Sequence, residues 1–367
     1  MVTADNSTFA EDIAPDVLVL SRPDGFADVV LASAVLEPAR KALPRAKIFL
    51  LIREKYAGIF CNHPALDGLI FLDEAAGLRA LAKKLKAVRA DALAHLAYSE
   101  FVADAAKLAK IRNVSAFEDD ADADRDGGVT LEVIPSERHR ETHEAFFNFE
   151  VLAPFGVPEA DKPRLDVSPD PAEKPSAVAK LAQYGIAGTD YAVFNLDCNP
   201  QGHYVDPAVF SRAAEWLRDH APMPIVVVGE KNDEATPRFL RFCRTTHGTP
   251  ILDLRGQTTP AEAAWLLGGA RLCLSGENAC AYLAAAMHCP LVALFVDFSS
   301  GRWFPLGHLT TNIFTGAHRF FLEPTSFYNR RASRAFSDEK MASALQFALA
   351  LRDAAGRGDP AAGTPPR

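Results

Sequence analysis

The chain of 367 residues is long for one domain and suits two, each large enough to bury its own core. Hydrophobic residues make up 49% of it and charged residues 23%, a balance that is typical of a soluble globular protein. The net charge of -8 argues against nucleic-acid partners, because these require a basic surface.

The N-terminus and the cysteines indicate a compartment. The opening stretch, "MVTADNSTFAEDIAPD", lacks the basic and apolar segments of a signal peptide. No part of the sequence reaches the roughly 18 apolar residues that a membrane-spanning helix needs. The six cysteines form no CxxC pair and several lie in apolar runs, which is typical of buried thiols in a reducing compartment. We expect a cytoplasmic protein.

The first half of the chain alternates short apolar runs with amphipathic segments. After a disordered N-terminus at 1–15, this alternation predicts βαβ units and a parallel sheet in a domain at 16–160. The predicted strands are 16–22, 47–53, 68–73 and 91–98, and the predicted helices are 27–43, 74–90 and 136–156.

Residues 157–180 are rich in Pro, Asp and Lys and lack periodicity at first, so we place the link between domains there, with the linker itself at 161–180. The alternation then restarts and predicts a second domain at 181–335. Its predicted strands are 191–197, 224–230, 250–254, 270–275 and 290–296, and its predicted helices are 206–220, 259–269 and 279–288.

A last helix at 336–355 precedes a Gly/Pro-rich tail, 356–367, that we expect to be disordered. The predicted fold class is α/β, with two doubly wound Rossmann-like domains that face each other across a cleft. Such folds bind ligands at the carboxyl ends of their strands, so the cleft is the expected ligand site.

The acidic segment "DADRDGGVTLEV" (122–133) begins like a calcium loop. The loop requires a bidentate Glu at its twelfth position, where this chain has Val133, and flanking helices are missing. We predict a solvated acidic hairpin loop and no metal site.

Two strand-to-helix corners carry polar residues. In "SRPDGFADVV" (21–30), Asp24 and Asp28 either compensate a helix dipole or hold a reactive carboxylate at the sheet edge, and the residues alone leave both interpretations open. In "LCLSGENACAYLAAA" (272–286), a tight turn leads directly into an Ala-rich helix. The free N–H groups and the dipole of such a helix start suit a diphosphate.

These segments, in this order, resemble the bacterial heptosyltransferases of glycosyltransferase family 9, which have the two-domain GT-B fold. The resemblance runs from about Asp16 to about Ala355. The family's R-x-D-x-x-G-D is matched at residues 22–28, and its G-N-D-S-G-P-x-H-L-A-A-A aligns with "SGENACAYLAAA". "KIFLLIREKYAGIF" and "SSGRWFPLG" match its second strand and its R-W turn. The chain departs from the family pattern at Ala27, Glu277 and Tyr282, and around Gln201 and His203, where many members carry a lysine.

The resemblance implies inverting, metal-independent transfer of a heptose-like sugar from a nucleoside diphosphate to a lipopolysaccharide-core or other glycan acceptor. It assigns Asp28 as the base, with Asp24 orienting the base or the acceptor. It implies no cofactor beyond an ADP-heptose-like donor substrate. It also implies peripheral contact with the cytoplasmic face of the inner membrane, and a final helix that packs back on the first domain.

Most of the remaining site residues follow from the same resemblance. The implied acceptor-binding residues are Arg22, Arg53 and Lys55. The implied donor-binding residues are Gly276, Glu277, Asn278, Ala279, Tyr282 and Arg302. Glu230, Lys231 and Glu234 are added as donor-binding candidates because they follow the predicted strand 224–230, where they could contact ribose or phosphate.

Bland interpretations stay open for several of these residues. Tyr282 also fits a buried helical tyrosine, Lys55 an ordinary surface residue, and residues 230–234 a solvated turn. Two other functions stay open as well. One is a catalytically impaired homologue that acts as a nucleotide-sugar-binding or scaffold protein. The other is a two-domain ligand-binding protein of the periplasmic kind.

Overall fold

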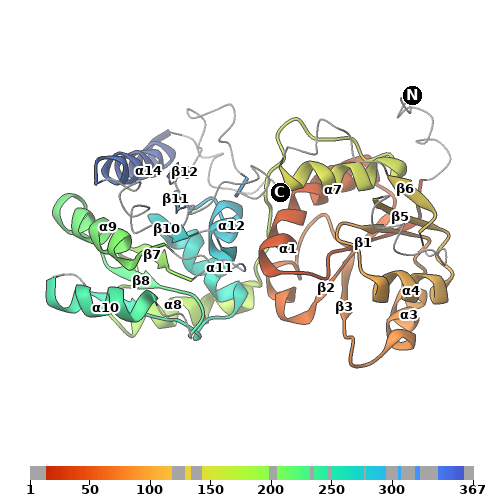
Figure 1. The fold of residues 1–367 in the computed structure, drawn as a ribbon, viewed down its shortest axis with the longest axis horizontal. Coiled ribbons are helices and arrows are strands. Elements are labelled where there is room, and N and C mark those ends of the chain that lie inside the picture. Colours follow the sequence, from red (N-terminus) through yellow and green to blue (C-terminus); the bar gives the residue numbers. More distant parts are fainter. Residues whose placement is uncertain are drawn as a thin grey trace. The chain divides into compact units, whose positions relative to one another are not determined.

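The structure, a computed structural model, describes most of the chain. The described residues are 14–117, 129–133, 143–197, 205–231, 235–246, 250–276, 278–294, 305–306, 319–322 and 338–358. They form two compact units that divide between Ser168 and Pro169. Figure 1 shows that each unit has its own sheet.

The sheet of the first unit has six parallel strands in the order β3-β2-β1-β4-β5-β6. The strands are β1 Val17–Ser21, β2 Lys47–Arg53, β3 Gly68–Leu72, β4 Ala92–His95, β5 Asn113–Phe117 and β6 Leu131–Val133. This is the strand order of the doubly wound dinucleotide-binding fold. Its topological switch point lies between β1 and β4, where Ser21 pairs with His95.

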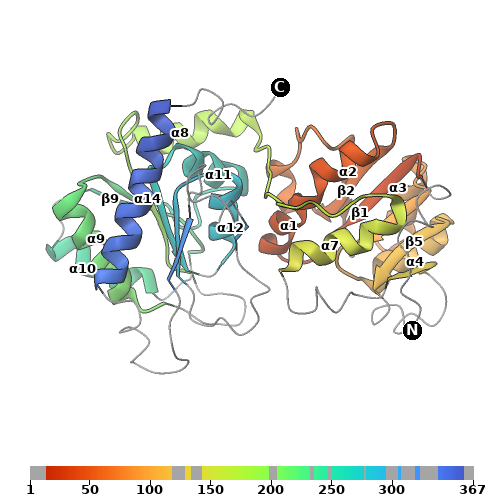
Figure 2. The same ribbon diagram turned by 90° about the horizontal axis from the view of Figure 1, so that it is seen from above.

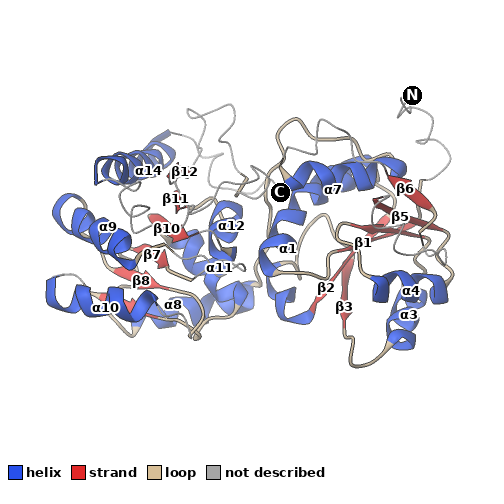
Figure 3. Ribbon diagram, in the orientation of Figure 1, coloured by secondary structure: helices blue, strands red, loops and turns tan. Residues whose placement is uncertain are grey.

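Helices cover both faces of this sheet (Figure 3). The helices are α1 Phe26–Ala32, α2 Leu36–Ala42, α3 Leu78–Ala87, α4 Glu100–Ala109 and α7 Glu144–Leu152. Apolar side chains of α3 and α4 pack on one face. α7 packs against α1, β4 and β5. Because both faces are covered, β1 is buried along its whole length, which explains its continuous apolar sequence.

The sheet of the second unit repeats this topology, in the order β12-β11-β10-β7-β8-β9. Its strands are β7 Ala192–Asn195, β8 Ile225–Val227, β9 Ile251–Asp253, β10 Leu272–Gly276, β11 Leu291–Leu294 and β12 Arg319–Leu322, all parallel. Renumbered from β7, this order is again that of a doubly wound sheet, with the switch point between β7 and β10.

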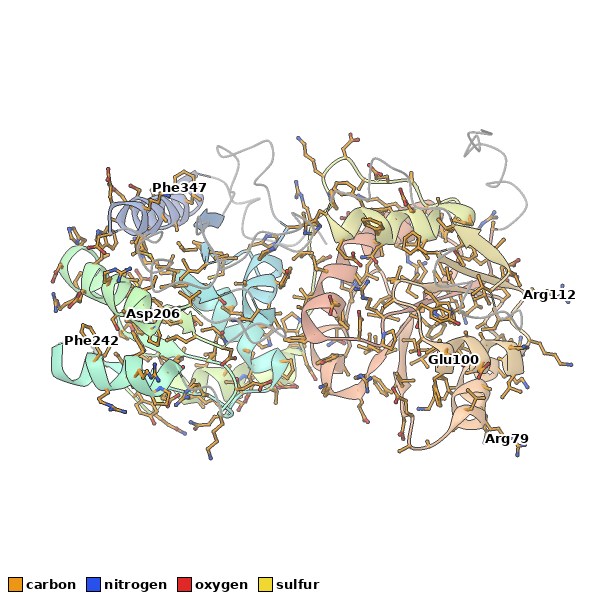
Figure 4. All side chains as sticks on the ribbon, in the orientation of Figure 1. Arg79, Glu100, Arg112, Asp206, Phe242 and Phe347 are labelled. Atoms are coloured by element: carbon orange, nitrogen blue, oxygen red, sulfur yellow. The ribbon has the colours of Figure 1, made fainter. Side chains whose placement is uncertain are left out.

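The helices of the second unit are α8 Lys174–Ala182, α9 Pro207–His220, α10 Ala235–Thr246, α11 Pro260–Gly269, α12 Ala279–Ala286 and α14 Asp338–Gly358. α9 begins as predicted, with the Asp206 side chain accepting a hydrogen bond from the N–H of Ala208. Asp206 is labelled in Figure 4, where side chains fill the space between the sheet and the helices of each unit.

The final helix contradicts one expectation. α14 packs against α9, β11 and β12 of the second unit (Figure 2). Its Met341, Leu345 and Leu349 belong to the core formed by β7, β8, β10 and β11. The prediction that this helix packs back on the first domain is therefore wrong, because its apolar face completes a core within its own unit.

The link between the units is shorter than the predicted linker at 161–180. Leu165 and Val167 are buried, and the N–H of Ser168 donates to the carbonyl of Ile59 in the first unit. Only two residues later, the carbonyl of Asp170 accepts from the indole of Trp265, and α8 then packs on α11. The residues on each side of the link are thus packed into their own unit. The Pro-, Asp- and Lys-rich composition of 157–180 does not show this packing.

Several sequence predictions can be compared with these elements. The elements that were not predicted are α4, α8, α10, β5, β6 and β12. β6 lies at the end of the predicted acidic hairpin loop, 122–133, but it pairs with β5 in parallel and so is not a hairpin strand. Residues 118–128 lie outside the described residues. The termini that we expect to be disordered fall largely outside the described residues too. Among the described helices, none is both long and apolar enough to span a bilayer.

Candidate active site

The first corner is organised around a buried arginine. Arg22 follows β1, and its side chain is only 2% exposed. Its Nε donates to Asp24 Oδ1 at 2.9 Å, and its Nη1 donates to the carbonyl of Leu96 at 2.5 Å. The same Nη1 donates to Asn148 Oδ1 at 3.1 Å. This burial argues against the predicted contact between Arg22 and an acceptor, because the guanidinium is occupied from within the protein.

Two further carboxylates face this guanidinium. Glu144, at the start of α7, lies 3.5 Å from Nη1, and Asp28, in the first turn of α1, lies 3.6 Å from Nη2. Glu144 is 8% exposed and Asp28 is 27% exposed. Three carboxylates therefore share one buried positive charge at the switch point of the first sheet.

Asp28 is partly shielded from water and sits among like charges. Burial and the Asp24 carboxylate raise its pKa from 3.8 to about 6, against the opposing charge of Arg22. The backbone of Gly25 also hydrogen-bonds to this carboxylate, as expected of an acidic side chain in a first helical turn. The position of Asp28 is thus compatible with both interpretations of the sequence. A carboxylate with a pKa near neutral is suited to accept a proton.

The predicted acceptor residues lie at the same edge of the sheet, where Arg53 ends β2 and Lys55 follows it. Arg53 Nε donates to the carbonyl of Pro23 at 2.8 Å, and its Nη2 lies 3.3 Å from Glu74. Lys55 is exposed and lies 4.9 Å from the ring centroid of Tyr56, which stacks on Phe26. Both cations are on the surface, beside the corner that holds Asp28.

The second corner joins three strands through side-chain amides and one carboxylate. Asn278 precedes α12, and its Nδ2 donates to Asn195 Oδ1 at 2.7 Å and to the carbonyl of Asp197 at 3.0 Å. Asp197 Oδ2 accepts from Asn195 Nδ2 at 3.1 Å and from the N–H of Glu230 at 3.0 Å. The ends of β10, β7 and β8 are thereby tied together at the switch point of the second sheet.

The start of α12 has the geometry of an anion site, with one N–H already used. Asn278 Oδ1 accepts from the N–H of Cys280, while Gly276 ends β10 and the half-buried Ala279 opens the helix. Ala279 adds only a methyl group beside this turn. Glu230 and Lys231 are exposed near the neighbouring end of β8, and their contact with the donor stays a prediction.

Tyr282 matches its bland interpretation, because it is 4% exposed within α12. Glu234, Glu277 and Arg302 lie outside the described residues, as does the loop with Gln201 and His203. Sequence reasoning did not single out Asn195, Asp197, Glu144 or Asn148. Asn195 and Asp197 carried a signal, since both are polar residues at the end of an apolar strand. Glu144 and Asn148 carried none, because only the tertiary structure brings α7 to Arg22.

Gly229 is the residue that permits the close approach of the β8 end to Asp197. Its φ is +138°, and a Cβ placed there would lie 2.4 Å from Asp197 Oδ2. Gly229→Ala must therefore displace the carboxylate as well as strain the backbone, and we expect a loss of roughly 2–4 kcal/mol in the free energy of unfolding. Denaturant unfolding measures it, with Gly185→Ala as control, where φ is +71° but no atom lies within 4 Å. Equal losses in the two variants would contradict the role given to Asp197.

The family model for glycosyltransferase family 9 (heptosyltransferase) matches residues 78–319. The chain belongs to glycosyltransferase family 9. The match covers well over half of the chain, and it begins after the corner that carries Arg22, Asp24 and Asp28. The assignment therefore does not depend on the first motif.

Known members of glycosyltransferase family 9 are similar in sequence and fold. The chain is 23% identical to lipopolysaccharide heptosyltransferase 3 of Escherichia coli over 304 residues, which cover 80% of this chain and 87% of that protein. The crystal structure of a family 9 glycosyltransferase from Veillonella parvula has a TM-score of 0.78 at 18% identity, covering 94% of this chain and 99% of the other. The E. coli ADP-heptose lipopolysaccharide heptosyltransferase II has a TM-score of 0.73 at 16% identity, covering 92% and 99%. The protein is thus a glycosyltransferase with the GT-B fold.

Proposed function

We propose that this glycosyltransferase moves a heptose-like sugar from a nucleoside diphosphate to a glycan acceptor, with inversion at the anomeric carbon. The observation that carries the proposal is Asp28. Its carboxylate lies at the carboxyl edge of the first sheet with a pKa raised to about 6, which suits a general base. The acceptor oxygen attacks the anomeric carbon, the bond from that carbon to the phosphate oxygen breaks, and the acceptor proton passes to Asp28.

The leaving nucleoside diphosphate gains negative charge as this bond breaks. In our proposal the turn Gly276–Asn278 and the start of α12 stabilise that charge, through backbone N–H groups and the positive end of the helix. Ala279 keeps the approach open. This arrangement requires no catalytic metal and no cofactor other than the nucleotide-sugar substrate.

The nature of donor and acceptor is inferred from relatives. One relative is a lipopolysaccharide heptosyltransferase, and another is an ADP-heptose lipopolysaccharide heptosyltransferase. From these relatives we infer an ADP-heptose-like donor and a lipopolysaccharide acceptor. Arg53, at the end of β2, and Lys55, just after it, would face the phosphates of such an acceptor. A lipid-linked acceptor would place the protein at the cytoplasmic face of the inner membrane.

The donor is tested first, because binding does not require the acceptor. A ligand that binds only the folded protein raises its melting temperature, so a panel of ADP-, UDP-, GDP- and dTDP-sugars identifies the base. We expect the ADP-sugar to give the largest rise. Transfer is then followed by mass spectrometry of a heptose-deficient lipopolysaccharide acceptor.

One observation favours a second candidate, a nucleotide-sugar-binding homologue without transferase activity. Where the resemblance places a histidine, this chain has Tyr282, and it is buried. Such a protein would show the thermal shift without any transfer or donor hydrolysis. A product in the mass spectrum excludes it.

Ala279→Leu is expected to weaken nucleotide diphosphate binding about tenfold or more. The added bulk would obstruct the approach of the phosphates to the backbone at the start of α12, where Ala279 is half-buried. Isothermal titration of ADP measures the affinity, and Ala179→Leu on the exposed side of α8 is the matched control. Unchanged ADP affinity in a folded Ala279→Leu protein would refute this position for the diphosphate.

A further inference from the structure

We propose that Glu144 is a positioning residue for Asp28 and acts on it through the buried guanidinium of Arg22. The proposal rests on the proposed role of Asp28 as the base and adds the part of the protein that controls it. Glu144 opens α7, far from Asp28 in sequence, and its carboxylate is 8% exposed. It lies outside the motif that carries Arg22, Asp24 and Asp28.

The geometry fixes Arg22 from several sides. Nε is taken by Asp24, and Nη1 is shared by the carbonyl of Leu96, Asn148 and Glu144. Only Nη2 points to Asp28, at 3.6 Å, too long for a hydrogen bond. The contacts made by α7 therefore hold the guanidinium on its inner side and leave Asp28 a charge neighbour without a tight hydrogen bond. Apart from the hydrogen bond with the backbone of Gly25, a base held in this way keeps its lone pairs available for an acceptor.

The charges lead to the same assignment. The charged groups that act on Asp28 are Asp24 and Arg22 from its own corner and Glu144 from α7. An arginine remains protonated when buried, so one positive charge faces three carboxylates. The negative charge of Glu144 offsets part of the attraction between the guanidinium and Asp28, and it also repels the Asp28 carboxylate. Both effects raise the pKa of Asp28. A tightly paired Asp28 would be a weaker base.

Asn148 offers a second way to change the charge near Arg22 and Asp28. It is 1% exposed, its Oδ1 accepts from Arg22, and its Nδ2 has no hydrogen-bond partner among the described residues. Asn148→Asp therefore adds a carboxylate of nearly the same shape without breaking an existing bond of Nδ2. It should act on Asp28 in the opposite direction to Glu144→Gln.

The test follows the ionisation of Asp28 itself and needs neither donor nor acceptor. Full-length protein labelled with carbon-13 at the aspartate carboxyls is titrated by NMR, and the Asp28 signal is assigned by its loss in Asp28→Asn. We expect a wild-type midpoint near pH 6. Glu144→Gln should lower it by a few tenths of a pH unit or more, and Asn148→Asp should raise it.

Glu150→Gln is the matched control, because it removes the same charge from the same helix and Glu150 does not act on Asp28. An Asp28 midpoint that is the same in wild type, Glu144→Gln and Asn148→Asp would overturn the proposal. A shift in the control equal to that in Glu144→Gln would overturn it too, since any charge on α7 would then suffice. If the midpoints move as expected and no transfer is found with any donor, the proposed function fails and the positioning role stands.

Discussion

The Asp28→Asn enzyme is expected to transfer sugar about a hundredfold or more slowly than the wild type, which is the usual scale for loss of a general base. Asn keeps the size of the side chain and its ability to hydrogen-bond, but it cannot take the acceptor's proton. Because the proposed donor site lies in the other unit, ADP affinity should not change. Steady-state rates with the native donor and acceptor measure the first effect, and titration calorimetry the second.

The same substitution should also make the protein more stable at neutral pH. The pKa of Asp28 is about 6 in the folded protein and 3.8 when unfolded, so the folded state binds more protons between these values. The unfolding free energy therefore falls as the pH rises from about 4 to 6, and the ionised carboxylate costs up to about 3 kcal/mol above that range. Asn removes this cost, so the gain should be full above pH 6 and absent near pH 3.

Stability thus separates the two interpretations of this corner. If Asp28 served only to compensate the dipole of α1, its loss would lower stability by about 0.3–1 kcal/mol and leave turnover intact. A catalytic carboxylate held among like charges gives the opposite result in both measurements. Denaturant unfolding at pH 7.5 and pH 3.5 decides between them. An Asp28→Asn protein that is less stable than wild type at pH 7.5 would contradict our assignment.

The fold could be predicted where the sequence carries local signals. Fully buried strands such as β1 and β11 are continuous apolar runs, and Asp206 with Pro207 marks the start of α9. β5, "NVSAF", was not predicted because it is short and contains polar residues. One of them is Ser115, whose Oγ donates to the carbonyl of Val151. The packing of α14 was not predicted correctly either, because an apolar helix face does not specify which core it covers.

The candidate site divides in the same way. Asp28 and the turn before α12 belong to continuous motifs, so the resemblance to the family was enough to propose their chemistry. Glu144 looked like one charge in a polar stretch, and the sequence holds nothing to show that it is buried beside Arg22. Contacts across such a separation in sequence depend on how α7 packs against α1.

The final prediction concerns Arg22→Met, which should lower the free energy of unfolding by about 3–5 kcal/mol at neutral pH. The substitution keeps much of the apolar stem but leaves Glu144 and Asp28 without their shared counter-charge. It also removes the donors to the carbonyl of Leu96 and to Asn148. Urea unfolding measures the loss, and Arg271→Met is the control. Arg271 pairs with Asp190 at 2.7 Å, but Asp190 is 65% exposed, so that loss should stay within about 1 kcal/mol.

The pH dependence of this loss shows whether charge is its cause. Without the guanidinium, the carboxyl group of Asp28 holds its proton to still higher pH in the folded protein, because the positive charge that lowers its pKa is gone. Ionisation of Asp28 then destabilises the folded variant more than the wild type, so the deficit relative to wild type should shrink toward pH 3, where this carboxyl group is neutral. Adding Glu144→Gln to Arg22→Met should recover part of the stability, because one uncompensated charge is gone. A deficit that is the same at pH 3 and pH 7.5, with no recovery in the double variant, would mean that Arg22 contributes by packing alone and that the shared charge does not hold this corner together.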